Sequence, residues 1–234
     1  MSSPAPPPAE RPRIAVLVPS SDTSVEIELP RRLGGAASIH VARMRLDSVT
    51  AEGLRGLEAS ALEQAAGLRQ IAPDLALFAC TSGTFLRGAA FERGFVAELE
   101  ELLGARVLTA ARSMVRALVA RGTRVRLVAS YTEDLVAAES AYLRDHGLEV
   151  ASARGLGILD DEATARVTPA QLAEAAAGAA GDGADAVMLS CTNLRTLDAS
   201  AWLEQRIGLP VVSSNSALAE AALAALGSGS DPFE

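Results

Sequence analysis

The chain has 234 residues, of which 49% are hydrophobic and only 3% aromatic, enough for a large core in one domain or two similar lobes. Its formal net charge is −8 and it has no basic stripe, so nucleic acids and anionic membranes are poor partners. No apolar run approaches the roughly 18 residues that a membrane-spanning helix needs.

Both ends of the chain have the composition of loosely ordered segments. Residues 1–12 form a proline-rich lead that lacks the apolar centre of a signal peptide, and residues 227–234 form a flexible tail. Two cysteines are too few for a disulfide scaffold. We therefore expect a cytoplasmic protein with reduced thiols.

Short apolar runs alternate with amphipathic helical patterns throughout the chain. In the first half we predict strands over 13–18, 74–79 and 106–108, a strand-like stretch over 38–44, and helices over 52–71, 91–103 and 112–121. In the second half we predict strands over 124–129, 185–190 and 209–213, and helices over 134–146, 164–181 (starting as late as Pro169), 199–207 and 216–226.

The two halves of the chain repeat each other. The strand that begins at Arg13 has a counterpart at Arg124, and the strand that runs into Cys80 has a counterpart that runs into Cys191; both steps are 111 positions. Two landmarks with one offset indicate an internal duplication. We predict an α/β fold of two pseudo-symmetric Rossmann-like lobes with parallel sheets, over 13–117 and 118–226. Residues 209–226 are expected to pack back on the first lobe.

The cysteines occupy chemically useful positions. In parallel sheets the functional loops follow the carboxyl ends of the strands, and pseudo-twofold symmetry brings equivalent ends to a shared cleft between the lobes. A turn from strand to helix offers backbone N–H groups and a positive dipole end, which lower the pKa of a thiol. The alternative is that Cys80 and Cys191 merely fill the core, as buried cysteines often do. Their symmetric placement favours function.

Two thiols on opposite sides of a small molecule allow two kinds of reaction. One thiol can take a proton from a carbon while the other returns a proton to the opposite face, or one can add to an activated double bond while the other transfers a proton. Either reaction needs donors that hold a carboxylate. The loops at the strand ends supply hydroxyl and amide groups from Ser20, Ser21, Thr81, Ser82, Thr192 and Asn193, and Tyr131 and Thr132 lie in another of these loops.

Three segments carry a family resemblance: VPSSDTSVEIELP over 18–30, ACTSGTF over 79–85 and SCTNLRTLDA over 190–199. Together they resemble the maleate cis–trans isomerases of the aspartate/glutamate racemase superfamily, with the arylmalonate decarboxylases as relatives. The resemblance covers about residues 13–226. It implies a homodimer without metal or organic cofactor that acts on a small carboxylate.

The resemblance also implies roles for individual residues. Cys80 is the nucleophile that adds to the alkene, and Cys191 assists by proton transfer or by shielding the intermediate. Tyr131 matches a tyrosine that contacts a substrate carboxylate, and the Ser20-Ser21 loop matches a carboxylate-binding stretch. The residues flanking the cysteines, Ser82 and Asn193 among them, hold the other carboxylate.

One residue departs from the family pattern, which has Asn where this chain has Asp22. An ionised Asp22 repels a substrate carboxylate, so it points away, is protonated, or faces a substrate with an uncharged or cationic group, such as an amide. Three other functions stay open: a racemase that uses both thiols, a decarboxylase of the arylmalonate type, which resembles this chain but keeps only the second cysteine, and a non-catalytic binding protein.

The remaining polar clusters predict no further site. Asp160, Asp161 and Glu162 precede a helix, so we assign them to capping and solvation. His40 and His146 lie far apart in the sequence and resemble no metal site. No nucleotide-binding glycine motif occurs, so we expect no cofactor and no metal.

Overall fold

The computed structural model describes residues 11–46, 48–177 and 181–228, so most of the predicted lead and tail lies outside the described residues. Two four-stranded parallel sheets form its framework. The first sheet has the order β2-β1-β3-β4, with β1 (Arg13–Pro19), β2 (Ser38–Met44), β3 (Leu75–Phe78) and β4 (Val107–Thr109). The second has the order β6-β5-β7-β8, with β5 (Arg124–Ala129), β6 (Glu149–Gly155), β7 (Ala186–Ser190) and β8 (Val211–Ser213).

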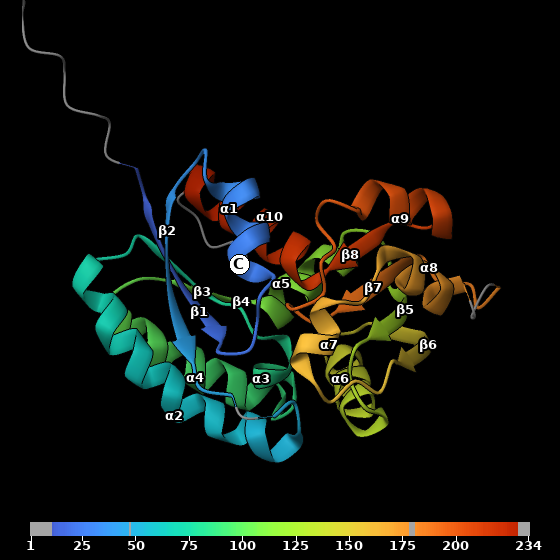
Figure 1. Cartoon of the computed structure of the whole chain (residues 1–234), viewed down its shortest axis with the longest axis horizontal. Coiled ribbons are helices and arrows are strands. Elements are labelled where there is room, and N and C mark those ends of the chain that lie inside the picture. Colours follow the sequence, from blue (N-terminus) through green and yellow to red (C-terminus); the bar gives the residue numbers. More distant parts are fainter. Residues whose placement is uncertain (1–10, 47, 178–180, 229–234) are drawn as a thin grey trace, which may run out of the picture.

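Helices cover both faces of the first sheet (Figure 1). Alternate side chains of β1 enter different clusters: Ile14 and Val16 pack with α1 (Val25–Leu33) and α10 (Ser214–Ser228), whereas Leu17 packs with the helices of the opposite face. That opposite face is covered by α2 (Ala51–Leu68) with its 3₁₀ extension η1 (Arg69–Ile71), α3 (Thr81–Phe85) and α4 (Gly88–Leu103).

The second sheet repeats this arrangement. Its helices are α5 (Ala110–Val119), α6 (Glu133–Asp145), α7 (Asp161–Ala165), α8 (Pro169–Ala177) and α9 (Ser200–Ile207). The predicted helix over 164–181 begins at Pro169, and its last predicted turn reaches residues outside the described range. No helix in the described ranges is both long and apolar enough to cross a membrane.

The last helix of each half packs on the sheet of the other half. Helix α10 contacts β3 and β4 of the first sheet, and α5 contacts β7 and β8 of the second. The two helices also lie against each other. This exchange joins the lobes through a shared core, so separating the lobes would expose substantial buried apolar area to water.

The duplication extends to individual hydrogen bonds. Asp74 accepts a bond from the N–H of Arg13 (2.7 Å), and Asp185 accepts the equivalent bond from Arg124 (2.9 Å). Further along, Glu100 accepts from the N–H that opens β4 (2.9 Å), just as Glu204 does for β8 (3.0 Å). The predicted fold of two pseudo-symmetric parallel lobes is therefore confirmed.

Four elements have no predicted range of their own: α1, α3, β6 and α7. Helix α1 contains Pro30, which normally interrupts a helix. Strand β6 lies at a sheet edge and has partly exposed side chains throughout, so it lacks an apolar run. Helices α3 and α7 have only five residues each.

Candidate active site

A small cavity, here called the cysteine cavity, lies where the two sheets meet. The chain leaves β1 toward β2 on one side of the sheet and leaves β3 toward β4 on the other, and β5 and β7 repeat this in the second sheet. The loops after these strands therefore diverge and leave a crevice between them. The crevices of the two lobes coincide in one cavity of about 10 Å³, room for about one water molecule. It is lined by Pro19, Asp22, Leu46, Val49, Cys80, Thr81, Ser82, Tyr131, Asp161, Cys191, Thr192 and Asn193.

Cys80 is the residue that precedes α3, as predicted. Its side chain is buried, and Sγ lies 3.9 Å from the Oγ atom of Ser82. Burial raises the pKa of the Cys80 thiol to about 12, although the N–H of Gly83 and the Ser82 hydroxyl act to lower it. The expectation of a lowered thiol pKa was wrong, because loss of hydration outweighs the local donors.

Cys191 also follows its strand, but the predicted helix directly after it is wrong. The chain makes turns there, and the next helix, α9, starts at Ser200. Cys191 has a φ of 150°, which L-residues rarely adopt, so its backbone is held under strain. Burial, followed by the charge of Asp161, raises the pKa of the Cys191 thiol well above its usual range. Both cysteines are therefore neutral thiols in the cysteine cavity.

Ser214, at the start of α10, connects the two cysteine loops. Its Oγ accepts a hydrogen bond from the N–H of Cys191 (3.1 Å) and lies 2.9 Å from the Oγ1 of Thr81. Sequence reasoning missed Ser214, because the bond depends on the exchange of α10 between lobes. The Thr81 hydroxyl is thus engaged by the protein itself.

Tyr131 is the most conspicuous hydrogen-bond donor in the cavity. Its side chain is fully buried, and its hydroxyl has no hydrogen-bond partner of ordinary geometry among the described residues. Burial raises the pKa of Tyr131 well above 10, although the nearby Ser190 hydroxyl acts to lower it, so the phenol stays protonated and is able to donate. A buried donor without an acceptor is costly in a protein and typical of a binding site.

Two carboxyl groups line the same cavity. Asp22 is 1% exposed, and its Oδ1 accepts hydrogen bonds from the N–H groups of Ser24 (2.8 Å) and Val25 (2.9 Å). Its Oδ2 is buried with no partner of ordinary geometry in the described ranges. Burial raises the pKa of Asp22 to about 6, against the lowering effect of these donors and of the Thr192 hydroxyl. Asp22 therefore does not point away from the site.

The second carboxyl group belongs to Asp161, which we assigned to capping and solvation; the structure corrects this. Asp160 is the cap of α7, because its Oδ1 accepts the N–H of Glu162 (3.0 Å). Asp161 instead lines the cavity and accepts a hydrogen bond from the Ser21 hydroxyl (2.6 Å). Its carbonyl accepts a bond from Nδ2 of Asn193 (2.7 Å).

Four predicted binding residues make contacts of other kinds. Both ends of the Asn193 amide bond to the protein: Nδ2 donates to the carbonyl of Asp161, and Oδ1 accepts a hydrogen bond from the N–H of Thr23 (2.9 Å). Three residues do not line the cysteine cavity: Ser20 bonds to the backbone of Leu46, Ser21 to Asp161, and Thr132 to Asp134. These side chains position loops around the site.

A second cavity of about 330 Å³ adjoins the cysteine cavity. Leu46, Val49 and Asp161 line both cavities, so they lie at the boundary between them. Within the described ranges, no group of three or more His, Cys, Asp or Glu side chains is arranged to hold a metal.

Comparison with known proteins identifies the family. Residues 14–232 match the family model for arylmalonate decarboxylase. The chain is 34% identical to a maleate isomerase from Pseudomonas putida, over 92% of this chain and 91% of the relative. It is also 34% identical to an arylmalonate decarboxylase from Bordetella bronchiseptica, over 88% and 84%.

A solved structure agrees with these matches. A cysteine-to-serine mutant of the Nocardia farcinica maleate cis–trans isomerase, with a covalently bound succinylcysteine intermediate, superposes with a TM-score of 0.86 at 28% identity, covering 92% of each chain. The chain therefore belongs to the family of the arylmalonate decarboxylases and maleate isomerases.

Proposed function

We propose that the protein is a cysteine-dependent cis–trans isomerase of the maleate isomerase type, acting on maleate or a close analogue. One observation carries the proposal: two buried thiols reach the single cysteine cavity from equivalent strand ends of the two lobes. The succinylcysteine intermediate of the related Nocardia farcinica enzyme is consistent with addition of a thiol to the substrate.

The proposed reaction is a reversible addition of one thiol across the double bond. Sγ of Cys80 bonds to one alkene carbon, Cys191 gives a proton to the other, and Cys191 takes up the proton that Cys80 releases. The former double bond is now single, so the adduct rotates about it. Elimination then returns the proton from carbon, breaks the C–S bond and releases the trans isomer with both thiols restored.

Hydroxyl groups support the developing charge. As the C–S bond forms, negative charge moves into the adjacent carboxylate, where fixed donors stabilise it. Tyr131 is suited to this role because its buried hydroxyl makes no hydrogen bond of ordinary geometry within the described chain. Ser82 and Thr192 add hydroxyls in the same cavity. Thr81 and Asn193 act through the loops that they hold, and Ser20, Ser21 and Thr132 through neighbouring contacts.

Both thiols are neutral before the substrate arrives, because burial raises the pKa of each. A step in which Cys191 supplies a proton fits a neutral thiol. The nucleophile is then generated only in contact with the substrate. This arrangement protects both cysteines from reaction with other electrophiles.

Decarboxylation is a second candidate, favoured by the match to the arylmalonate decarboxylase family model. It needs one proton donor, Cys191, and no nucleophile. The presence of Cys80 in the same cavity favours isomerisation.

The test is proton NMR of the purified protein in deuterated, reducing buffer with maleate and close cis-enoate analogues. We expect the alkene signals of the trans product, and loss of at least about 10³-fold in rate with Cys80→Ser. A substituted malonate runs in parallel, because a decarboxylase depends on Cys191 and tolerates Cys80→Ser. Full isomerase activity in Cys80→Ser would exclude the covalent mechanism.

The protein is further proposed to be a cytoplasmic homodimer. The two free cysteines and the absence of any described disulfide suit a reducing compartment. The dimer rests on the family resemblance, and light scattering coupled to size-exclusion chromatography tests it. A mass near 24.1 kDa would mean a monomer instead.

A further inference from the structure

The cysteine cavity is lined by acidic groups but by no basic one. Asp22 and Asp161 line it, while no arginine, lysine or histidine of the described chain does. The nearby Arg43 is engaged behind the loop, where its guanidinium donates to the carbonyl oxygens of Ser20 (2.8 Å) and Asp22 (3.0 Å) and pairs with Glu26. A dicarboxylate would thus place two negative charges among acids with no neutralising cation.

One oxygen of Asp22 lacks a well-placed donor: the Thr192 hydroxyl lies near enough to lower the pKa of Asp22 but makes no hydrogen bond of ordinary geometry with Oδ2. Its Oδ1 is fixed by two backbone N–H groups, which hold the carboxyl plane in place. Its Oδ2 is buried and lacks a partner of ordinary geometry among the described residues. A ligand with an N–H group satisfies this oxygen, whereas a carboxylate presents a third acceptor.

Asp161 is held close to the same point. The hydroxyl of Ser21 fixes its Oδ2 at 2.6 Å, and the Asn193 amide fixes its carbonyl. Its charge acts to raise the pKa values of Asp22, Cys80 and Cys191, so it lies near all three. Tyr131 lines the same cavity and offers a donor that has no acceptor of ordinary geometry.

We propose that Asp22 and Asp161 determine specificity, selecting a substrate with one carboxylate and one carboxamide: the monoamide of a cis-enedioic acid. The carboxylate accepts from Tyr131, and the amide N–H groups donate to the two aspartates. This inference rests on the proposed isomerase function. Like-charge contact against the wrong ligand is a common source of such selectivity.

The experiment compares maleamate, the monoamide, with maleate as substrates at pH 7.5, with kcat/KM measured by proton NMR. We expect the wild type to favour maleamate by at least about tenfold, and Asp22→Asn and Asp161→Asn each to shift the ratio toward maleate by a similar factor. Asp160→Asn is the matched control, because it removes one charge from a neighbouring cap and should leave the ratio within about twofold.

Binding of unreactive analogues separates this inference from the isomerase function. Succinamate and succinate are titrated by calorimetry into the wild type and the three variants. If succinamate binds more tightly and Asp22→Asn reverses the order, the charge selection holds even if no alkene is isomerised. Tighter binding of succinate by the wild type, or a maleate preference that both Asn variants leave unchanged, would overturn it.

Discussion

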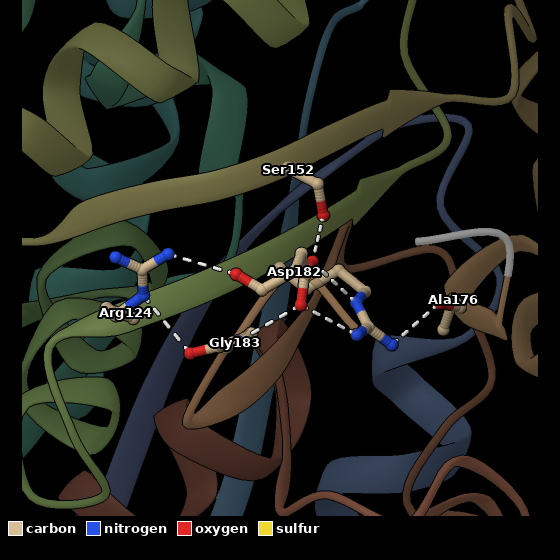
Figure 2. A network of polar contacts seen from close by, with 7 residues as sticks. Arg124, Ser152, Ala176, Asp182 and Gly183 are labelled. Atoms are coloured by element: carbon tan, nitrogen blue, oxygen red, sulfur yellow. Dashed lines mark hydrogen bonds and ion pairs between the residues drawn. The ribbon is translucent and has the colours of Figure 1, made fainter. Parts of the chain in front are cut away.

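Replacing Asp182 by Asn is expected to be among the most destabilising single changes on the second sheet. Asp182 precedes β7 and forms a two-point ion pair with Arg126 of β5, at 2.8 and 2.9 Å. The Arg126 side chain is only 6% exposed, and it also donates to the carbonyl of Ala176 (2.8 Å). Figure 2 shows Asp182 at the centre of this network, with the Ser152 hydroxyl directed toward it.

The size of the effect follows from burial. Loss of the carboxylate charge leaves a desolvated guanidinium without a counterion, which costs about 3–5 kcal/mol for a buried pair. The Asp182 side chain is 11% exposed and Asn retains its shape, so we expect about 3 kcal/mol. The matched control is Glu149→Gln. Glu149 pairs with Arg124, which lies on the same strand as Arg126, but the side chains of Glu149 and Arg124 are 59% and 41% exposed. Loss of that pair should cost less than about 1 kcal/mol.

Urea denaturation of both variants at several pH values provides the assay. The hydrogen bond and charge of Arg126 hold the pKa of Asp182 well below its usual range. A depressed carboxyl pKa stabilises the fold above the unfolded pKa, and this stabilisation is lost as the pH falls below about 4. The gap between wild type and Asp182→Asn should therefore shrink below about pH 4. Equal costs for the two variants at pH 7, or a gap independent of pH, would refute the reasoning.

Three further predictions concern buried polar groups near the site. Tyr131→Phe removes an unpaired hydroxyl, so calorimetry should find stability unchanged or higher, while kcat/KM falls at least about 100-fold. Burial raises the pKa of Glu139 to about 8, so the folded state retains a proton that the unfolded state has lost. Wild-type stability should therefore fall by about 3 kcal/mol between pH 5 and 7.5, and Glu139→Gln should flatten this dependence in urea titrations. Glu28→Ala leaves the N–H groups of Thr196 and Leu197 without their carboxylate acceptor and should cost at least about 3 kcal/mol.

Each of these predictions has a contrary outcome. A large loss of stability in Tyr131→Phe would mean that its hydroxyl supports the fold. A steep pH dependence retained in Glu139→Gln would assign the titration to another group. A small effect of Glu28→Ala would mean that water satisfies the two N–H groups. For this last variant Glu26→Ala is a control, because Glu26 lies on the same helix and its side chain is 38% exposed.

The local pattern was sufficient for most of the framework. Buried strands such as β5 are short apolar runs bounded by polar loops, and a duplicated sequence repeats the same signal at a fixed offset. Cys80 and Cys191 could be placed at strand ends for that reason. Strand β6 was not found, because its partly exposed side chains give no apolar run.

The chemistry of the site was decided by tertiary structure. Asp160 and Asp161 are neighbours with the same side chain, yet one caps α7 and the other lines the cavity, because packing of α7 against the Ser21 loop fixes which way each points. The sequence predicted lowered thiol pKa values, whereas the thiol pKa values in the folded protein are raised, for a similar reason. Backbone donors near Cys80 are encoded locally, but loss of water depends on both lobes closing over the cavity, and burial is the larger effect. The sequence alone thus determined where the cysteines lie along the chain, and only the meeting of the two lobes determined what surrounds them.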